Sequence, residues 1–131
     1  MDTHAHEPAI RVSMLPRDTN AHGTIFGGVL LAYIDQAGAI ATRPHCDLVV
    51  TVKMNEVVFH EPVYVGDLVS FYARIVRVGT TSITVKVEVT AERWRRPGEV
   101  KRVTEAEVVY VNVGDDRRPA PIRAKAAGER A

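Results

Sequence analysis

One carboxylate, Asp35, lies in the middle of an otherwise apolar segment, residues 25–42. Burying a carboxylate without a partner would cost several kcal/mol, so its presence there needs an explanation. One interpretation is a narrow solvent-facing strip along a helix, whose other members are Ala32, Gln36, Ala39 and Arg43. The other is a cleft, where poor hydration would tune Asp35 as a general base or a nucleophile.

Two adjacent glycines, Gly27 and Gly28, stand near the start of the same segment. Glycine weakens a helix, so the pair also needs a reason. A tight chain entry or close helix packing is one reason. The other is that the bare backbone N–H groups of a helix N-terminus face a substrate oxygen, where they would hold the negative charge that develops when a carbonyl is attacked.

The elements that position these residues follow from the apolar pattern. Residues 25–42 are rich in Leu and Ala and longer than an ordinary strand, which predicts a helix that ends before Pro44. Apolar and polar residues then alternate, most regularly over residues 83–90, as in a half-buried antiparallel strand. We predict strands over residues 10–15, 48–59, 67–78, 81–94 and 100–113.

The predicted order is β-α-β-β-β-β, an α+β fold in which one helix covers one antiparallel sheet. The helix is apolar on nearly all sides, and one sheet cannot enclose it completely. We therefore expect part of its surface to meet a second subunit, in at least a dimer.

The chain has 131 residues, of which 46% are hydrophobic and 25% are charged. We expect one domain, residues 9–114, between a flexible N-terminus, residues 1–8, and a flexible basic C-terminal tail, residues 115–131. A net charge of +1 gives no field that would attract nucleic acid or a membrane. The single cysteine, Cys46, excludes an internal disulfide, and neither an export signal nor a membrane span is visible, so we expect a cytoplasmic protein.

Several segments carry a family resemblance. Residues 18–31 (DTNAHGTIFGGVLL), followed by Ile34 and Asp35, resemble the opening of acyl-CoA thioesterases of the YciA and brain acyl-CoA hydrolase type. The similarity continues in residues 57–69 (VVFHEPVYVGDLV), 78–83 (VGTTSI), 104–106 (TEA) and 109–111 (VYV).

The resemblance implies a hotdog fold, in which a five-stranded antiparallel sheet wraps a long helix. It implies active sites at a dimer interface, where Asp35 of one subunit and Asn20 of the other form the catalytic pair. Asp35 would activate a water or attack the thioester carbonyl itself, and both routes stay open. Backbone groups of Phe26, Gly27 and Gly28 would stabilise the oxyanion. Thr51 is a weaker candidate, because threonine is also simply a good strand former.

For coenzyme A, the resemblance implies contacts in the turn after residue 78 and on the strand before it. With two residues near the helix start, the expected substrate-binding set is Phe26, His22, Arg74, Arg77, Gly79, Thr80, Thr81 and Ser82. Thr80 departs from several relatives, which carry a basic residue there. The missing charge could come from a second cluster, Arg93, Arg95, Arg96, Lys101 and Arg102, although such clusters are commonly solvated hairpin ends.

We expect no metal, because His22, His45, His60 and Cys46 do not fall at zinc-ligand spacings. We also expect no cofactor, since coenzyme A is part of the substrate. The resemblance further implies a trimer of dimers.

Two other functions stay open: a hotdog hydratase or dehydratase, which would need His22 or His60 beside a carboxylate, and a non-catalytic acyl-CoA-binding regulator. Nucleic-acid binding ranks last.

Overall fold

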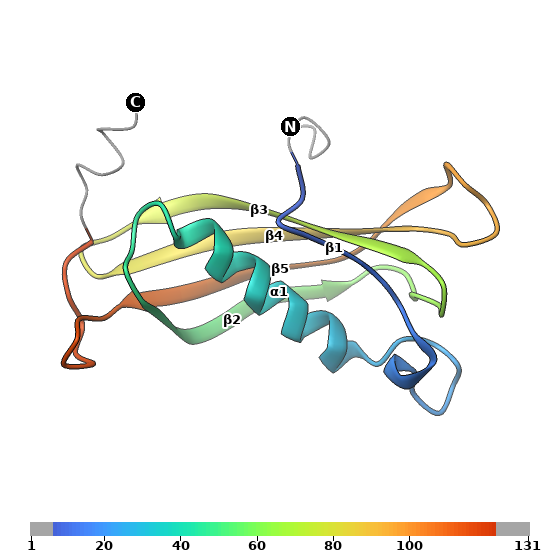
Figure 1. Ribbon diagram of the computed structural model, residues 1–131, viewed down its shortest axis with the longest axis horizontal. Helices are drawn as coiled ribbons and strands as arrows, with labels where there is room; N and C mark the ends of the chain where they lie inside the picture. Colours follow the sequence, from blue (N-terminus) through green and yellow to red (C-terminus); the bar gives the residue numbers. More distant parts are fainter. Residues whose placement is uncertain (1–6, 123–131) are drawn as a thin grey trace.

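The computed structural model describes residues 7–122 of the chain. One long helix, α1 (Gly27–Thr42), crosses a sheet of five strands (Figure 1). The strands are β1 (Ile10–Ser13), β2 (Val49–Phe59), β3 (Leu68–Val78), β4 (Ser82–Glu92) and β5 (Val100–Asn112), and a single 3-10 turn (Pro16–Asp18) follows β1. The predicted element order is confirmed, and each element begins and ends within two residues of its predicted bounds. No helix in residues 7–122 is long and apolar enough to cross a membrane.

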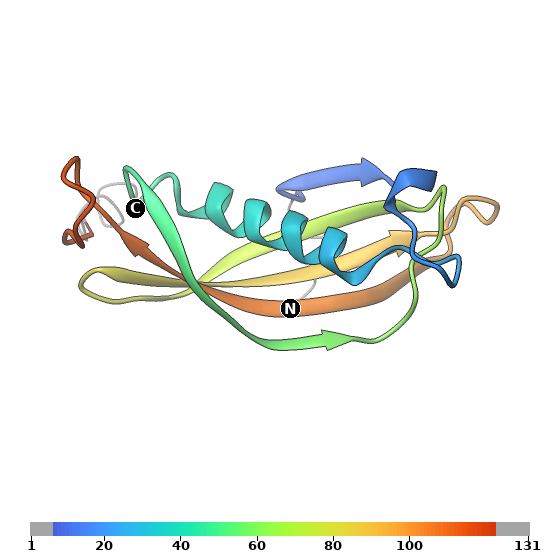
Figure 2. The same ribbon diagram turned by 90° about the horizontal axis from the view of Figure 1, so that it is seen from below.

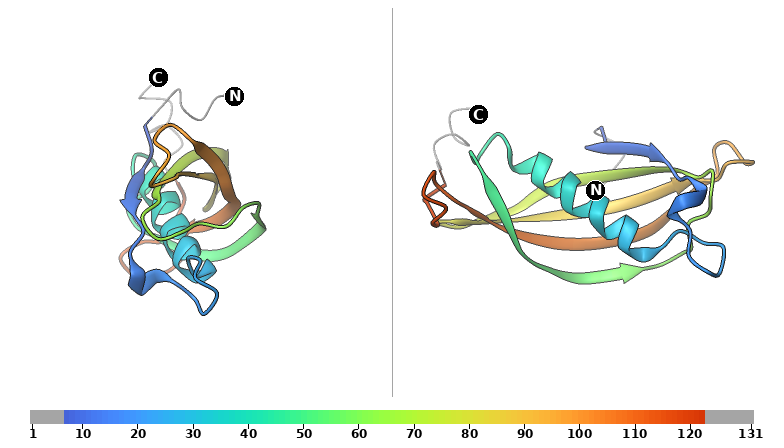
Figure 3. Two further views of the ribbon diagram at one scale, coloured as in Figure 1. Left: turned by 90° about the vertical axis from the view of Figure 1, so that its right-hand side faces the viewer. Right: turned by 60° about the horizontal axis from the view of Figure 1, so that its bottom comes forward.

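The sheet is antiparallel throughout, in the order β1-β3-β4-β5-β2. Its central strand, β4, has the alternation that the sequence predicts: Ile83, Val85, Val87 and Val89 are all fully buried under α1. The residues between them face the other side of the sheet, where Lys86 and Glu88 are half-buried and Thr84 is buried. Seen end-on, the sheet curves around one side of the helix (Figure 3).

The edge strand β2 is irregular. Its register with β5 shifts between Thr51 and Lys53 and again between Asn55 and Val58, and Glu56 between the latter two has a left-handed φ of 53°. Such bulges bend a strand, and β2 curls around the helix below the rest of the sheet (Figure 2). Its apolar side chains remain between 40% and 52% exposed at Val50, Val52, Val58 and Phe59. One chain therefore leaves an apolar edge uncovered, as expected of a subunit that associates.

Part of the predicted flexible C-terminal tail is folded, which corrects our expectation for residues 115–122. The Gly114 N–H donates to the Arg118 carbonyl, and the Ile122 N–H donates to the Thr80 carbonyl at 2.8 Å. The Ile122 side chain is only 7% exposed and joins the core. The rest of the two predicted flexible ends, residues 1–6 and 123–131, lies outside the described residues.

Candidate active site

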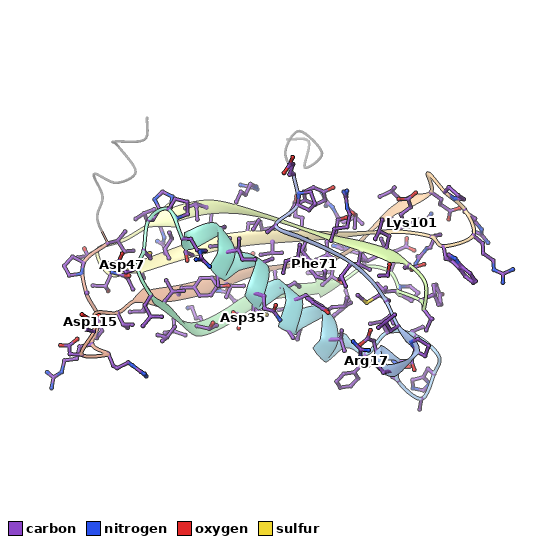
Figure 4. All side chains as sticks on the ribbon, viewed as in Figure 1. Arg17, Asp35, Asp47, Phe71, Lys101 and Asp115 are labelled. Carbon is purple, nitrogen blue, oxygen red and sulfur yellow. The ribbon has the colours of Figure 1, made fainter. Side chains whose placement is uncertain are left out.

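Asp35 lies midway along α1 (Figure 4) and is half-buried. Of the other members of the predicted solvent-facing strip, Ala32, Gln36 and Arg43 are exposed and Ala39 is half-buried, so most of the strip exists. Asp35 stands at the edge of that strip, where the Thr51 hydroxyl donates to its Oδ1 atom at 2.7 Å. The carboxylate is thus withdrawn from full solvation and held by one neutral donor.

A second strand residue also contacts Asp35. The Tyr110 hydroxyl donates to the backbone carbonyl oxygen of Asp35 at 2.6 Å, and the Tyr110 side chain is fully buried. Burial, and then the negative charge of Asp35, raise the pKa of Tyr110 far above its usual value, so this hydroxyl stays protonated and acts as a donor. The sequence analysis missed this contact. Its signal was Gly38, a glycine inside the helix on the buried face.

The helix begins at Gly27, and Phe26 is its N-cap residue. The first N–H groups of any helix have no intrahelical acceptor. The Phe26 ring lies close over Gly28: a Cβ atom added at Gly28 would be 2.7 Å from the ring. Phe26 is 56% exposed and its ring can turn away, so packing alone does not require a glycine at position 28. At Gly27 a Cβ atom would lie 3.4 Å from the Phe59 ring, which is a tolerable distance.

Asn20 organises the loop before the helix. Its side-chain oxygen accepts from the backbone N–H groups of His22 at 2.8 Å and Thr24 at 3.2 Å, while its amide nitrogen donates to the Thr24 hydroxyl at 3.0 Å. The sequence pattern suggests a role in substrate chemistry for Asn20 and does not predict these loop contacts. The segment between β2 and β3 also holds this loop, since the Ile25 N–H donates to the Val63 carbonyl.

Within one chain, the predicted catalytic residues do not form a single site. Asp35 follows Gly27 by eight residues, which corresponds to about 12 Å along the helix axis. The loop with Asn20 lies beyond that helix start (Figure 2). One carbonyl group cannot be reached both by the Asp35 carboxylate and by the N–H groups of Gly27 and Gly28 of the same chain. A site that uses all of these groups needs two chains.

The predicted coenzyme A residues also fall into two groups. Gly79, Thr80, Thr81 and Ser82 form the tight turn between β3 and β4, with the Gly79 N–H donating to the Ser82 carbonyl at 2.7 Å. Arg74 and Arg77 are exposed on β3. This turn lies at the opposite end of the molecule from the start of α1 and the loop that precedes it, which carries His22 and Phe26 (Figure 1). The two groups can meet at one ligand only across a subunit interface.

The second basic cluster is largely neutralised by carboxylates. Arg93 donates to Asp67 at 2.6 Å and to the Pro62 carbonyl at 3.0 Å. Asp67 is only 2% exposed, so this pair fixes the loop between β2 and β3 against the end of β4. Arg96 and Arg102 pair with carboxylates as well. This pattern favours the hairpin-end interpretation of the cluster over a phosphate site.

His60 forms a pair with a carboxylate, Glu105, that does not lie beside Asp35. Its Nε2 atom lies 3.2 Å from Glu105, which also pairs with Lys86 at 3.4 Å. Burial alone would raise the pKa of Glu105, yet the hydrogen bond with His60 and the charge of Lys86 outweigh it and lower that pKa. Ala106 is buried under α1, and alternation places Glu105 on the opposite face, away from Asp35.

An apolar groove opens beside the helix start, which sequence reasoning could not locate. Its volume is about 290 Å³. Ile25, Gly27, Leu30, Phe59, Pro62 and Val63 form its apolar lining, and the two polar residues that also line it are His60 and Glu61. In residues 7–122, no three or more His, Cys, Asp and Glu side chains are grouped to hold a metal.

Comparisons with known proteins identify the family. The model of the thioesterase superfamily matches residues 22–97. The acyl-CoA thioester hydrolase YciA of Salmonella typhimurium is 41% identical over 119 residues, which cover 88% of this chain and 90% of that protein.

Two solved structures share the fold. A hexameric hotdog fold thioesterase of Campylobacter jejuni has a TM-score of 0.91 and 44% identity, with 98% of both chains covered. A hexameric broad-specificity acyl-coenzyme A thioesterase, solved with one aspartate replaced by alanine, has a TM-score of 0.86 and 33% identity, with 93% of this chain and 95% of that one covered. The predicted hotdog fold is confirmed, and the chain belongs to the thioesterase superfamily.

Proposed function

We propose that this thioesterase hydrolyses acyl-CoA to a free carboxylic acid and coenzyme A. The observation that carries the proposal is the half-buried Asp35 carboxylate, held by the Thr51 hydroxyl on a helix whose first turn carries glycines. The relatives named as acyl-CoA thioester hydrolases support the substrate class. No cofactor is needed, because a carboxylate, backbone donors and water supply the chemistry, and coenzyme A arrives with the substrate.

Two routes use the same groups. In the first route, the Asp35 carboxylate takes a proton from a water molecule, and the oxygen of that water attacks the thioester carbon. The tetrahedral oxyanion accepts hydrogen bonds from the N–H groups of Gly27 and Gly28, and collapse expels the coenzyme A thiolate, which receives the proton. In the second, Asp35 attacks the carbon, expels the thiolate and forms a mixed anhydride that water then cleaves. Asn20 holds the water or the carbonyl oxygen.

The site is assembled from two subunits. Asp35 and Thr51 come from one chain, and Asn20 with the helix start comes from its partner. The same arrangement brings Phe26 and His22 of one chain toward Arg74, Arg77 and residues 79–82 of another. The exposed apolar edge of β2 supports such a dimer, and the hexameric solved neighbours support a trimer of dimers. A single cysteine favours the cytoplasm.

A panel of acyl-CoAs tests the proposal. The purified protein is mixed with thioesters from acetyl-CoA to palmitoyl-CoA and with one aryl thioester, and release of free thiol is followed. Steady turnover of at least one class supports hydrolysis. Tight binding of acyl-CoA without thiol release would instead favour the non-catalytic regulator.

The groove beside Gly27 is the proposed site of the acyl chain, because it adjoins the amides that would hold the carbonyl oxygen. Phe59 lines the groove and is 51% exposed. Replacing Phe59 with alanine lengthens the groove and is expected to raise the ratio of kcat/KM for long-chain over short-chain substrates by about tenfold. Val58→Ala is the matched control, since Val58 is a neighbouring exposed residue that does not line the groove. An unchanged ratio in Phe59→Ala would place the acyl chain elsewhere.

A further inference from the structure

Asp35 is held at two different atoms by two strands. Thr51 of β2 and Tyr110 of β5 are register partners, directly opposite each other. The Thr51 hydroxyl donates to the carboxylate of Asp35, and the Tyr110 hydroxyl donates to the backbone carbonyl of the same residue. Side-chain and main-chain positions of one residue are thus both set by the β2-β5 pair.

The helix has a glycine where the Tyr110 ring needs space. Gly38 lies one turn after Asp35 and is buried. A Cβ atom there would collide with the Tyr110 hydroxyl and lie 3.1 Å from two ring carbons. Any other residue would push the helix away from β5 or displace the ring. A glycine inside a helix weakens it by roughly 0.5–1 kcal/mol relative to alanine, and this contact explains why one stands here.

We propose that Tyr110, with the space left by Gly38, is a positioning residue for Asp35. The inference rests on the proposed role of Asp35 in hydrolysis. The Tyr110 bond sets the depth and rotation of the helix turn that carries the carboxylate, so that Thr51 and the reacting atoms meet it at the correct distance. Tyr110 is fully buried and acts through Asp35, so it is not a catalytic residue.

The helix itself does not depend on this bond. In a regular helix the Asp35 carbonyl also accepts from the N–H of Ala39, four residues later, and that N–H contributes a hydrogen bond to the Tyr110 hydroxyl as well. Loss of the Tyr110 hydroxyl therefore leaves the helix intact and removes only its tie to β5. Loss of the Tyr110 hydroxyl should therefore change the placement of the Asp35 carboxylate. Misplacement of a catalytic group by a fraction of an ångström lowers the turnover number more than it weakens substrate binding.

The test is Tyr110→Phe, which keeps the ring and removes the hydroxyl. We expect kcat for thiol release to fall about tenfold, with KM within about twofold. Ile83→Val is the matched control, because Ile83 is the β4 register partner of Tyr110 and is equally buried but does not contact Asp35 through a hydrogen bond. It is expected to lose some stability and keep its kcat. An unchanged kcat in Tyr110→Phe would overturn the inference.

A double-variant comparison separates positioning from general destabilisation. Adding Tyr110→Phe to Asp35→Asn is expected to leave the residual rate unchanged, because the group being positioned is already gone. If the tenfold loss persists in the Asp35→Asn background, Tyr110 acts on the fold generally and the inference fails. If Asp35→Asn itself retains full activity, the proposed function fails instead, and the two failures are distinguishable.

Discussion

Replacing Asp35 with asparagine is expected to lower kcat for acyl-CoA hydrolysis at least about a hundredfold. Both routes require a carboxylate at this position, either to take a proton from water or to attack the carbonyl. The asparagine side chain has the same shape, and its oxygen can still accept the Thr51 hydroxyl, which donates to Asp35 at 2.7 Å. The variant therefore removes the chemistry and keeps the contact. The measurement is the initial rate of thiol release at saturating substrate.

The matched control makes the same chemical change elsewhere. Glu107→Gln converts a half-buried carboxylate on β5 into an amide, on the sheet face away from α1. We expect its kcat to stay within about twofold of the wild type, since surface changes away from the site have small effects. Equal losses in Glu107→Gln and Asp35→Asn would mean that folding or assembly, rather than catalysis, had been measured.

The second large effect is complementation between subunits. Asn20→Asp keeps an oxygen that can accept the His22 and Thr24 N–H groups but replaces the amide donor, which reaches the Thr24 hydroxyl, with a carboxylate oxygen. It is expected to lower kcat about a hundredfold, as does loss of one oxyanion donor. Neither it nor Asp35→Asn should be active alone. When the two are unfolded and refolded together, half of the dimers are mixed, and each mixed dimer has one site with both native residues. About a quarter of the wild-type activity should return, given a two-fold symmetric dimer.

The reverse mixture is the control for this experiment. A chain that carries both substitutions is refolded with an equal amount of wild type. If Asn20 and Asp35 act across the interface, both sites of each mixed dimer are damaged and about a quarter of the activity survives. If the two residues act within one chain, about half survives, and the mixture of single variants recovers nothing. The pair of mixtures therefore decides where the site lies.

Local patterns made most of the fold predictable. The alternation over residues 83–90 identified β4, whose apolar positions are buried as expected. The helix begins two residues later than predicted. Phe26 is still extended, with φ −60° and ψ 130°, and the Ile25 N–H donates to the Val63 carbonyl instead of joining the helix. That hydrogen bond joins segments distant in sequence, so an apolar pattern cannot show where the helix starts.

The features that were missed depend on contacts between distant segments. Residues 115–122 are rich in Pro and charge, and only their contacts with distant residues, such as that of Ile122 with Thr80, show that this stretch is folded. The bulges in β2 depend on its pairing with β5. Asp35 was predictable as a candidate because a carboxylate in an apolar helix is anomalous. Its tie to Tyr110 was not, since 75 residues separate them.

The central claim is that Asp35 carries the hydrolysis and does not merely help to bind acyl-CoA. The most direct test measures two quantities in the same preparations of wild type and Asp35→Asn: the rate of thiol release from the best substrate of the panel, and the affinity for coenzyme A by titration calorimetry. We expect the rate to fall at least about a hundredfold while the affinity stays within about threefold. A variant that hydrolyses acyl-CoA as fast as the wild type would contradict it.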